Sequence, residues 1–150
     1  MCTSQHLTIP IPILALILGL ACLPGLAAAE GYGPQKVVYH FNTNNPQVNA
    51  AGLKNIHNHF NALAKGQLTV VALVHSAAWE MVAKEKADPK QVEKMLALIE
   101  QGVVFKMCKN TLNDRNLDPE RDLAIPMTVV PAGVAELAKL QQEGYAYIKP

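Results

Sequence analysis

The sequence predicts a single α/β domain in which helices cover both faces of a five-stranded parallel sheet. Short apolar runs rich in valine and leucine alternate along the chain with segments whose apolar residues recur every three or four positions. The first pattern is typical of buried strands and the second of amphipathic helices, and their regular alternation indicates a parallel sheet. The chain of 150 residues is long enough for one such domain.

The first 29 residues are predicted to be a signal peptide rather than part of this domain. Residues 9–29 carry no charge, and Ala27 and Ala29 supply small side chains shortly before Glu30, as at a secretory cleavage site. The apolar run is short for a membrane span, and three prolines interrupt it. We therefore expect cleavage after Ala29, export to the periplasm, and no membrane attachment of the mature chain.

Two alternatives to cleavage remain open. Residues 1–8 contain no Lys or Arg, whereas signal peptides normally carry positive charge there. Cys22 follows Gly-Leu-Ala, which is an imperfect lipoprotein site, and an uncleaved anchor is the other alternative. The cleaved form would consist of a flexible leader at residues 30–35 and a domain at residues 36–150.

The first part of the domain predicts two strands and one helix. Residues 36–41 are β-branched and aromatic, and they lie between Pro34 and an Asn-rich turn. Residues 48–65 place apolar side chains at steps of three and four, as in an amphipathic helix, and Gly66 follows where a C-cap glycine is expected. Residues 68–75 are almost continuously apolar, so this strand should be central and covered on both faces.

The rest of the domain predicts four more helical segments and three more strands. A short helix is expected within residues 76–86, and a longer one, residues 88–101, begins with an Asp-Pro pair as cap and first residue. The third strand is residues 103–107. The later elements are a short helix at 111–115, a polar loop at 116–125, a strand at 127–130, a helix at 131–143 and an edge strand at 145–149.

The apolar side chains of the two longer helices in this part should face the sheet. The inward residues are expected to be Val92, Met95, Leu96 and Ile99 in the first of these helices and Val134, Leu137 and Leu140 in the second.

Three strands present a titratable or nucleophilic side chain near their carboxyl ends. His40 lies near the end of the first strand, His75 ends the second, and Cys108 directly follows the third. Because the carboxyl ends of parallel strands share one edge, we expect these side chains to meet where α/β folds bind ligands. Chance placement of common residue types is the alternative.

Cys108 is the only cysteine that would remain after removal of the signal peptide. A helix start follows it, and the free amides and dipole there would stabilise a thiolate. Lys106, Lys109 and Arg115 add positive charge nearby, which would also lower the thiol pKa. We therefore expect a sulfur that is open to solvent and easily ionised. The alternative is a buried cysteine that only packs.

Composition and missing motifs exclude several function classes. The 13 Lys and Arg nearly balance the 12 Asp and Glu, which argues against nucleic acid as a partner. The sequence has no phosphate-binding loop, dinucleotide-binding glycine motif, Cys-x-x-Cys or Gly-x-Ser-x-Gly. His57 and His59 are two apart on a predicted helix, so they point in different directions and cannot share a metal ion. We expect neither a cofactor nor a metal.

Four segments, in this order, resemble the DsrE/DsrF-like family of the YchN type, over about residues 36–150. They read VVYH with GLKNIHN, then VVALVH, then GVVFKMCKNTL with RNL, and finally VVPAGVAEL with EGYAYIK. The resemblance implies a three-layer α/β/α domain with a five-stranded parallel sheet, commonly assembled into oligomers. Characterised relatives in sulfur oxidation and tRNA thiolation carry sulfur as a cysteine persulfide, so Cys108 would be the sulfur-accepting residue.

The first functional hypothesis is an exported sulfur carrier. Cys108 would attack a persulfide or polysulfide, and Lys109, Asn110 and Arg115 would hold the anion. Its partners would be a sulfur donor or acceptor protein, or a small sulfur species. An export signal would separate the chain from the partners of cytoplasmic sulfur relays.

Two other hypotheses stay open. In one, the protein is a non-enzymatic homo-oligomeric module whose sheet edge, around His40, His75 and Cys108, binds a small ligand or metal. In the other, it is an exported α/β domain whose cysteine only packs. The sequence does not decide whether the protein is an enzyme.

Overall fold

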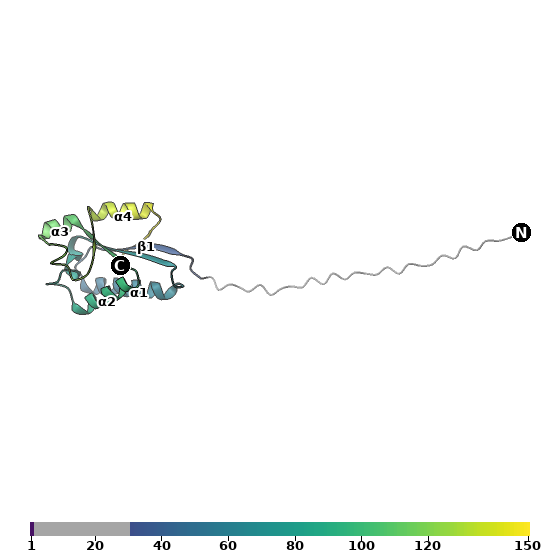
Figure 1. Ribbon diagram of the computed structural model, residues 1–150, viewed down its shortest axis with the longest axis horizontal. Helices are drawn as coiled ribbons and strands as arrows, with labels where there is room; N and C mark the ends of the chain where they lie inside the picture. The colour runs from purple at the N-terminus through teal and green to yellow at the C-terminus, as the bar shows by residue number, and fades with distance from the viewer. Residues whose placement is uncertain (2–30) are drawn as a thin grey trace. The chain divides into compact units, whose positions relative to one another are not determined.

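The computed structural model describes Met1 and residues 31–150, and residues 31–150 form the three-layer α/β/α domain that the sequence predicts (Figure 1). The predicted signal peptide lies outside the described residues apart from Met1. No helix among the described residues has the length and apolar character needed to cross a bilayer. The elements in chain order are β1 (Gln35–Phe41), α1 (Pro46–Ala62), β2 (Leu68–Val74), the 3-10 helix η1 (Ser76–Met81), α2 (Pro89–Glu100), β3 (Val104–Cys108), α3 (Lys109–Arg115), β4 (Thr128–Val130), α4 (Gly133–Gln142) and β5 (Ala146–Ile148).

All five strands are parallel, in the order β4-β3-β2-β1-β5. The apolar strand β2 is central, as predicted, and β5 is an edge strand, also as predicted. Since β3, β2 and β1 are neighbours and point the same way, their carboxyl ends lie side by side. The fold therefore meets the geometric condition for a site at that edge.

The two faces of the sheet are covered by different helices. In Figure 1, α1 and α2 lie on one face and α3 and α4 on the other. The face under α1 and α2 carries the larger hydrophobic core, which includes Phe41, Ile56 and Phe105. On the other face a smaller cluster packs under α4. It consists of Val38, Val71, Leu73, Val130, Leu137 and Leu140.

The predicted helix caps are partly correct. Asp88 caps α2 as predicted, because its side chain accepts a hydrogen bond from the backbone N–H of Lys90 at 2.9 Å. Asn45 caps α1, which begins at Pro46, two residues earlier than expected. The prediction that Gly66 caps α1 is wrong: the helix ends at Ala62, and Gly66, with φ +83°, lies in the turn that leads into β2.

Two predicted inward-facing side chains point outward instead. Leu96 in α2 is 41% exposed and Val134 in α4 is 68% exposed, whereas Leu98 and Gly133 are buried. In α4 the reason is the close approach of its first turn to β2 and β3. A glycine fits that contact, so Gly133 faces the sheet and the adjacent Val134 is turned away by about 100°.

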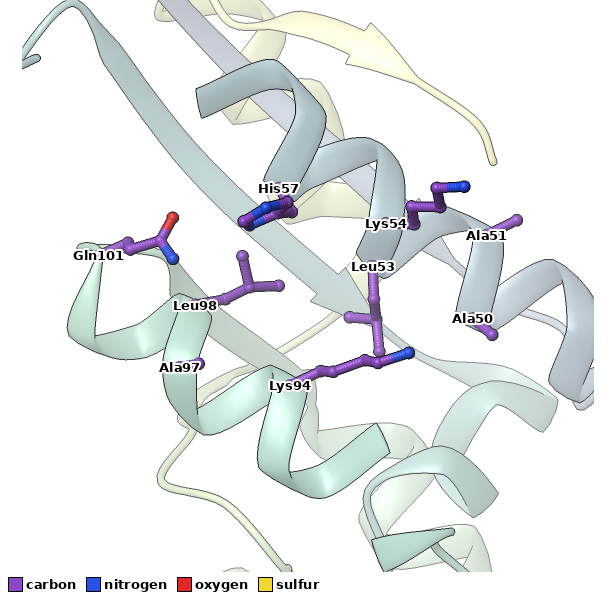
Figure 2. Close-up of a pocket in the computed structure, with 9 residues that line it drawn as sticks. All are labelled: Ala50, Ala51, Leu53, Lys54, His57, Lys94, Ala97, Leu98 and Gln101. Carbon is purple, nitrogen blue, oxygen red and sulfur yellow. The ribbon is translucent and has the colours of Figure 1, made fainter. Parts of the chain in front are cut away.

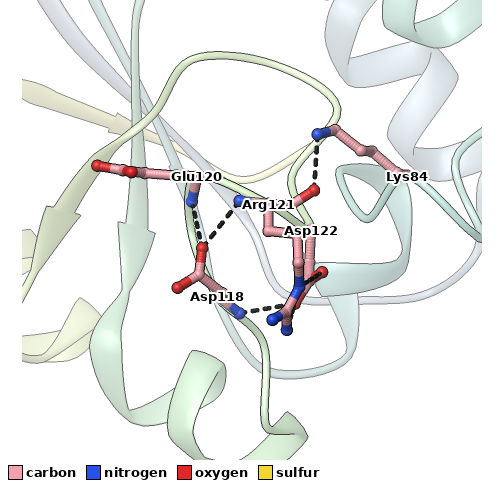
Figure 3. Close-up of polar contacts among 5 residues, drawn as sticks. All are labelled: Lys84, Asp118, Glu120, Arg121 and Asp122. Atoms are coloured by element: carbon pink, nitrogen blue, oxygen red, sulfur yellow. Dashed lines mark hydrogen bonds and ion pairs between the residues drawn. The ribbon is translucent and has the colours of Figure 1, made fainter.

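The long loop between α3 and β4 is held by its own polar side chains (Figure 3). Asp118 accepts hydrogen bonds from the backbone N–H groups of Glu120 and Arg121, and its own N–H donates to Asp122. Lys84 donates to the backbone oxygen of Arg121 at 2.6 Å, which ties the loop to the segment after η1. These bonds fix the approach to β4 in a stretch that the sequence predicts only as a polar loop.

We expect Gly52→Ala to destabilise the domain, although alanine favours helices. A β-carbon at Gly52 in α1 would lie 2.5 Å from Cε1 of Phe41 and 2.8 Å from Cγ of Pro150. Alanine gains about 1 kcal/mol of helix propensity over glycine, while overpacking a core costs about 1–3 kcal/mol. Phe41 is 1% exposed, so the overpacking cost should be near its upper limit, and we expect urea unfolding to show a net loss of stability of up to about 2 kcal/mol.

The matched control for this variant is Ala51→Gly, which changes the adjacent exposed position of α1 in the opposite direction. It should cost only the propensity difference of about 1 kcal/mol. A Gly52→Ala protein more stable than the wild type would show that Phe41 and Pro150 yield to the methyl group.

Candidate functional site

Cys108 is the last residue of β3 and the residue immediately before α3. Its side chain is buried, at 5% exposed, so the prediction of a sulfur open to solvent is wrong. The physical reason is the first turn of α4, whose Gly133 has no side chain and lies directly against the thiol. The backbone N–H of Gly133 donates to Sγ of Cys108 at 3.2 Å.

The surroundings of this sulfur are polar despite its burial. Burial raises the pKa of the Cys108 thiol, but hydrogen bonds lower it by more, so that the pKa lies below its ordinary value of 9.0. The donors are the N–H groups of Thr111, Gly133 and Asn110, together with the Thr111 hydroxyl. The expectation of a lowered thiol pKa therefore agrees with the structure.

Hydrogen bonds, rather than neighbouring cations, cause this shift. Lys106 forms a partly buried ion pair with Glu136, so its charge is compensated. Arg115 lies at the far end of α3, about 9 Å along the helix axis from its start, with its guanidinium 5.7 Å from the ring of Trp79. The structure therefore separates Arg115 from the sulfur, contrary to the predicted anion site. Lys109 and Asn110 directly follow Cys108 in the exposed first turn of α3, and the backbone N–H of Asn110 donates to the sulfur.

His40 and His75 come together as the sequence predicts. Their Nε2 atoms are 2.5 Å apart, while the ring centres are 4.7 Å apart and the ring planes differ by 14°. Because the nitrogens are much closer than the centres, the nearly coplanar rings meet edge to edge, nitrogen to nitrogen. This geometry is that of an imidazole–imidazole hydrogen bond rather than of face-to-face stacking.

The edge strand β5 completes this arrangement. The hydroxyl of Tyr147 lies 2.7 Å from Nδ1 of His40, so both ring nitrogens of His40 have a partner. Lys149 donates to the backbone oxygen of His40 at 3.3 Å and to Oδ1 of Asn42 at 2.5 Å. These contacts hold His40, which is only 7% exposed, in one orientation.

These side chains lie on one face of the sheet. Tyr147 pairs with Val38 and His40 pairs with Leu73 in the strand register, and side chains two positions apart share a face. The same alternation puts His75 and Cys108 on that face, which is the one under α4. The row Tyr147, His40, His75, Cys108 thus crosses β5, β1, β2 and β3 in their spatial order.

Gly133 lies between the imidazole pair and the thiol. A β-carbon at this position would lie 3.2 Å from Cγ of His75 and 3.3 Å from Cβ of Cys108. The side chains of His75 and Cys108 therefore flank the same small space, with the α4 backbone packed over both. The sequence predicts these two residues at one edge, and the structure brings them together there.

Both imidazoles are held in the neutral form. Burial, then the nearby His75 and Lys149, lowers the pKa of His40 from 6.5 to about 4. Burial and Lys149 also lower the pKa of His75. At neutral pH each ring therefore carries one proton, and each can donate through one nitrogen and accept through the other.

The lowered pKa of His40 predicts a loss of stability in mild acid. Between pH 6.5 and about 4 the unfolded chain binds a proton that folded His40 does not, so the free energy of unfolding falls as the pH falls. At 1.36 kcal/mol for each pKa unit, His40 accounts for up to about 3 kcal/mol. The free energy of unfolding, measured with urea across this pH range, should depend less on pH in His40→Gln than in the wild type.

The matched control for this measurement is His57→Gln, at an exposed position of α1. The smaller slope of stability against pH should be specific to His40→Gln. A His40→Gln protein with the wild-type slope would contradict the assignment of this pH dependence to His40.

Four residues of the site were not predicted as functional. Thr111 donates to the sulfur, Gly133 packs over it, and Tyr147 and Lys149 contact His40. The sequence does contain one signal for Tyr147 and Lys149. If the predicted edge strand pairs with β1, alternate residues of that strand lie next to His40. Which strand neighbours β1 is set by tertiary packing, so the local pattern did not specify it.

No group of three or more His, Cys, Asp or Glu side chains with metal-binding geometry occurs in the described part of the chain. A cavity of about 560 Å³ lies elsewhere, between α1 and α2. Figure 2 shows Leu53 and Leu98 pointing toward one another across it, with Lys54 and Lys94 nearby. None of Tyr147, His40, His75 and Cys108 lines this cavity, so the cavity and the candidate site are separate features.

Comparison with known proteins agrees with this fold. A protein of unknown function from Methanobacterium thermoautotrophicum (MTH1491) has 27% identity and a TM-score of 0.69, covering 77% of this chain and 99% of that one. A conserved protein of unknown function from Bacteroides thetaiotaomicron (BT1422) shares the fold at 14% identity and a TM-score of 0.53, covering 77% and 95%. No curated protein matches significantly. The model of the DsrE/DsrF-like family matches residues 36–150, and the chain belongs to this family.

Proposed function

We propose that this protein is a sulfur carrier that holds sulfur as a persulfide on Cys108. The observation that supports it best is the hydrogen bonding of the sulfur. Backbone N–H groups from the starts of α3 and α4 converge on Sγ and favour the thiolate, which is the nucleophilic form. A cysteine that only packs would instead have aliphatic neighbours and a raised pKa.

The proposed reaction is a transfer of one sulfur atom. The Cys108 thiolate attacks the outer sulfur of a persulfide R–S–SH; a new S–S bond forms, the old S–S bond breaks, and R–S⁻ leaves with the electron pair. The product on the protein is Cys108–S–SH. An acceptor thiolate then takes the outer sulfur by the same exchange and restores the Cys108 thiolate, so no external oxidant or reductant is needed.

The burial of Cys108 favours a small or slender sulfur donor. With the side chain 5% exposed, a polysulfide ion or an extended cysteine persulfide would reach Sγ more easily than the flat surface of a folded protein. Lys109 and Asn110, exposed in the first turn of α3, are positioned to meet an approaching anion. Arg115 is not included in this role, because it lies at the other end of α3.

Export to the periplasm is part of the proposal. Its support is the uncharged segment 9–29 with small residues before Glu30. Intact mass of the protein purified from cells should correspond to a chain that begins at Glu30. A full-length chain or a lipid-modified Cys22 would favour the uncleaved or lipoprotein form.

We also propose that the protein forms a homo-oligomer. Exposed apolar side chains from β3 and α4, namely Val104 and Val134, support this assembly. Light scattering coupled to size-exclusion chromatography measures it directly, and a monomer at micromolar concentration would contradict it.

A small-ligand or metal-binding module is the second candidate, and the His40–His75 pair is the observation that favours it. Two imidazole nitrogens face one another near a thiol, and all three groups are potential metal ligands. In this arrangement, however, each Nε2 is engaged by the other, so a metal ion would first have to separate them. Metal analysis of the purified protein, with and without added Zn²⁺ or Cu⁺, separates this candidate from the first.

The experiment that tests the proposed function is mass spectrometry of the native chain from Glu30 after exposure to inorganic polysulfide. The sulfur-carrier function predicts one added sulfur on Cys108, released by dithiothreitol. Folded protein that remains unmodified, while the urea-unfolded protein reacts, would refute it.

A further inference from the structure

A small polar cavity lies between the first turns of α1 and α2. Its volume is about 220 Å³, and its lining comes from the turn after β1, from η1 and the segment after it, and from the two helix starts. These segments follow the carboxyl ends of β1 and β2, at the edge where α/β folds bind ligands. The lining residues Asn49 and Gln91 are 2% and 8% exposed, so the cavity reaches into the domain.

The amide of Asn49 is incompletely hydrogen-bonded at this cavity. Its Nδ2 donates to the backbone oxygen of Thr43 at 2.9 Å, and Thr43 is not part of the cavity lining. Its Oδ1 is buried and has no hydrogen-bond partner within residues 31–150. Leaving a buried acceptor unpaired is unfavourable, so this oxygen would gain from a ligand that donates a hydrogen bond to it.

The two helix starts beside the cavity have no free backbone donor to offer an anion. The first helical residues are Pro46 and Pro89, which have no N–H group. The next amides donate to the cap residues, Asn45 in α1 and Asp88 in α2. Helix starts commonly bind anions through such amides, but here the amides are already used.

The charged side chains at the cavity favour a cation instead. Glu80 of η1 is half-buried and Asp88 is exposed, and both carboxylates belong to the lining. Lys86 is the one positive side chain among the lining residues, so their net charge is negative. A Ca²⁺ ion takes about six to eight oxygen ligands, more than two carboxylates and one amide oxygen supply. A cation that carries N–H donors matches this set better.

We propose that this cavity binds a small compound with a primary ammonium group, whose N–H groups donate to Oδ1 of Asn49 and to the carboxylate of Glu80. The cavity is smaller than the sites of drug-sized ligands, so the compound should have only a few non-hydrogen atoms. Neither Cys108 nor any group that contacts its sulfur lines the cavity. The proposal therefore goes beyond the sulfur-carrier function and does not depend on it.

The first test uses propylammonium chloride as the probe. It is titrated at pH 7 into the ¹⁵N-labelled chain from Glu30, and binding is followed by two-dimensional ¹H–¹⁵N NMR. We expect saturable shifts of the Asn49 side-chain amide, and no such shifts with 1-propanol or sodium propionate. Saturable shifts at this cavity with propionate or CaCl₂ in place of propylammonium would overturn the proposal, as would shifts that propylammonium and propanol share.

Two charge variants then test the sign of the bound charge. Glu80→Gln should weaken propylammonium binding about tenfold, because a charge-assisted hydrogen bond is lost. Lys86→Gln should tighten it by about two- to fivefold, because a competing positive charge is removed from the rim. A bound anion would reverse both signs. An unchanged affinity in Glu80→Gln, or weaker binding in Lys86→Gln, would contradict the proposal.

The matched control is Glu85→Gln, which makes the same change of charge at an exposed residue outside this cavity. It should bind propylammonium within about twofold of the wild type. Asn49→Leu replaces the amide by an apolar group of similar size and should abolish binding. A folded Asn49→Leu protein with wild-type affinity would overturn the role of Oδ1, and the Glu80 and Lys86 variants decide the matter if this variant does not fold.

The same samples keep this proposal separate from the sulfur-carrier function. Cys108→Ser should bind propylammonium as the wild type does, because its thiol is not part of the cavity. A wild type that takes up sulfur but gives no saturable shifts with propylammonium would refute the ammonium site alone. A wild type that binds propylammonium but takes up no sulfur would refute the sulfur-carrier function alone.

Discussion

Cys108→Ser is expected to abolish sulfur loading completely while the domain remains folded. A serine hydroxyl has nearly the shape of the thiol and still accepts the hydrogen bond from the N–H of Gly133. Its oxygen cannot form a persulfide and is not ionised at neutral pH, so neither the nucleophile nor the carried group exists in this variant. In a chain that begins at Glu30 no other cysteine is present to substitute for it.

The measurement is mass spectrometry after polysulfide treatment, with circular dichroism and thermal unfolding recorded on the same samples. Ser76→Ala, which changes a hydroxyl next to His75 without touching the thiol, serves as the control and should load normally. Sulfur on the Cys108→Ser protein in wild-type amount would place the carrier group elsewhere and contradict the account.

Gly133→Val is expected to have the next largest effect, because it alters the sulfur's surroundings without altering the sulfur. Even the first carbon of a side chain would lie 3.2 Å from His75 and 3.3 Å from Cys108, and valine adds two methyl groups to it. The first turn of α4 must then move away. Its N–H leaves the sulfur, so the thiol pKa should rise. Sulfur uptake at pH 7 should then fall roughly tenfold for each pKa unit, because less of the thiol is ionised.

The uptake rate and the thiol pKa of Gly133→Ala should lie between those of the wild type and of Gly133→Val, because a single methyl group requires a shift of only a few tenths of an ångström. Ala135→Val, two positions along α4 at an exposed site, is the matched control and should keep the wild-type rate. The thiol pKa is read from the pH dependence of alkylation. A rate and a thiol pKa unchanged in Gly133→Val would mean that α4 does not shape the site.

The architecture could be predicted from the sequence because its determinants are local. The continuous apolar run in β2 indicates a central strand by itself, and Asp88 and Pro89 mark the start of α2 without reference to the rest of the chain. The edge position of His40, His75 and Cys108 followed from strand direction alone. Helix rotation was less predictable: Val134 was expected inside, and Gly133 occupies that place because α4 packs closely on β2 and β3.

The details of the site depend on contacts that a linear pattern does not contain. Arg115 and Cys108 are near in sequence, but a helix lies between them and directs the guanidinium to Trp79. Tyr147 is distant in sequence from His40 and becomes its partner only because β5 pairs with β1. The burial of Cys108 likewise depends on α4, whose contacting residue Gly133 lies 25 positions further along the chain.

The central claim is that Cys108 is an activated thiol although it is buried. Its most direct test is the pH dependence of alkylation of native Cys108, measured by mass spectrometry on the folded chain from Glu30. The account predicts a single titration with a midpoint clearly below the ordinary thiol value of 9.0. A midpoint at or above that value, or a thiol that reacts only after unfolding, would contradict it.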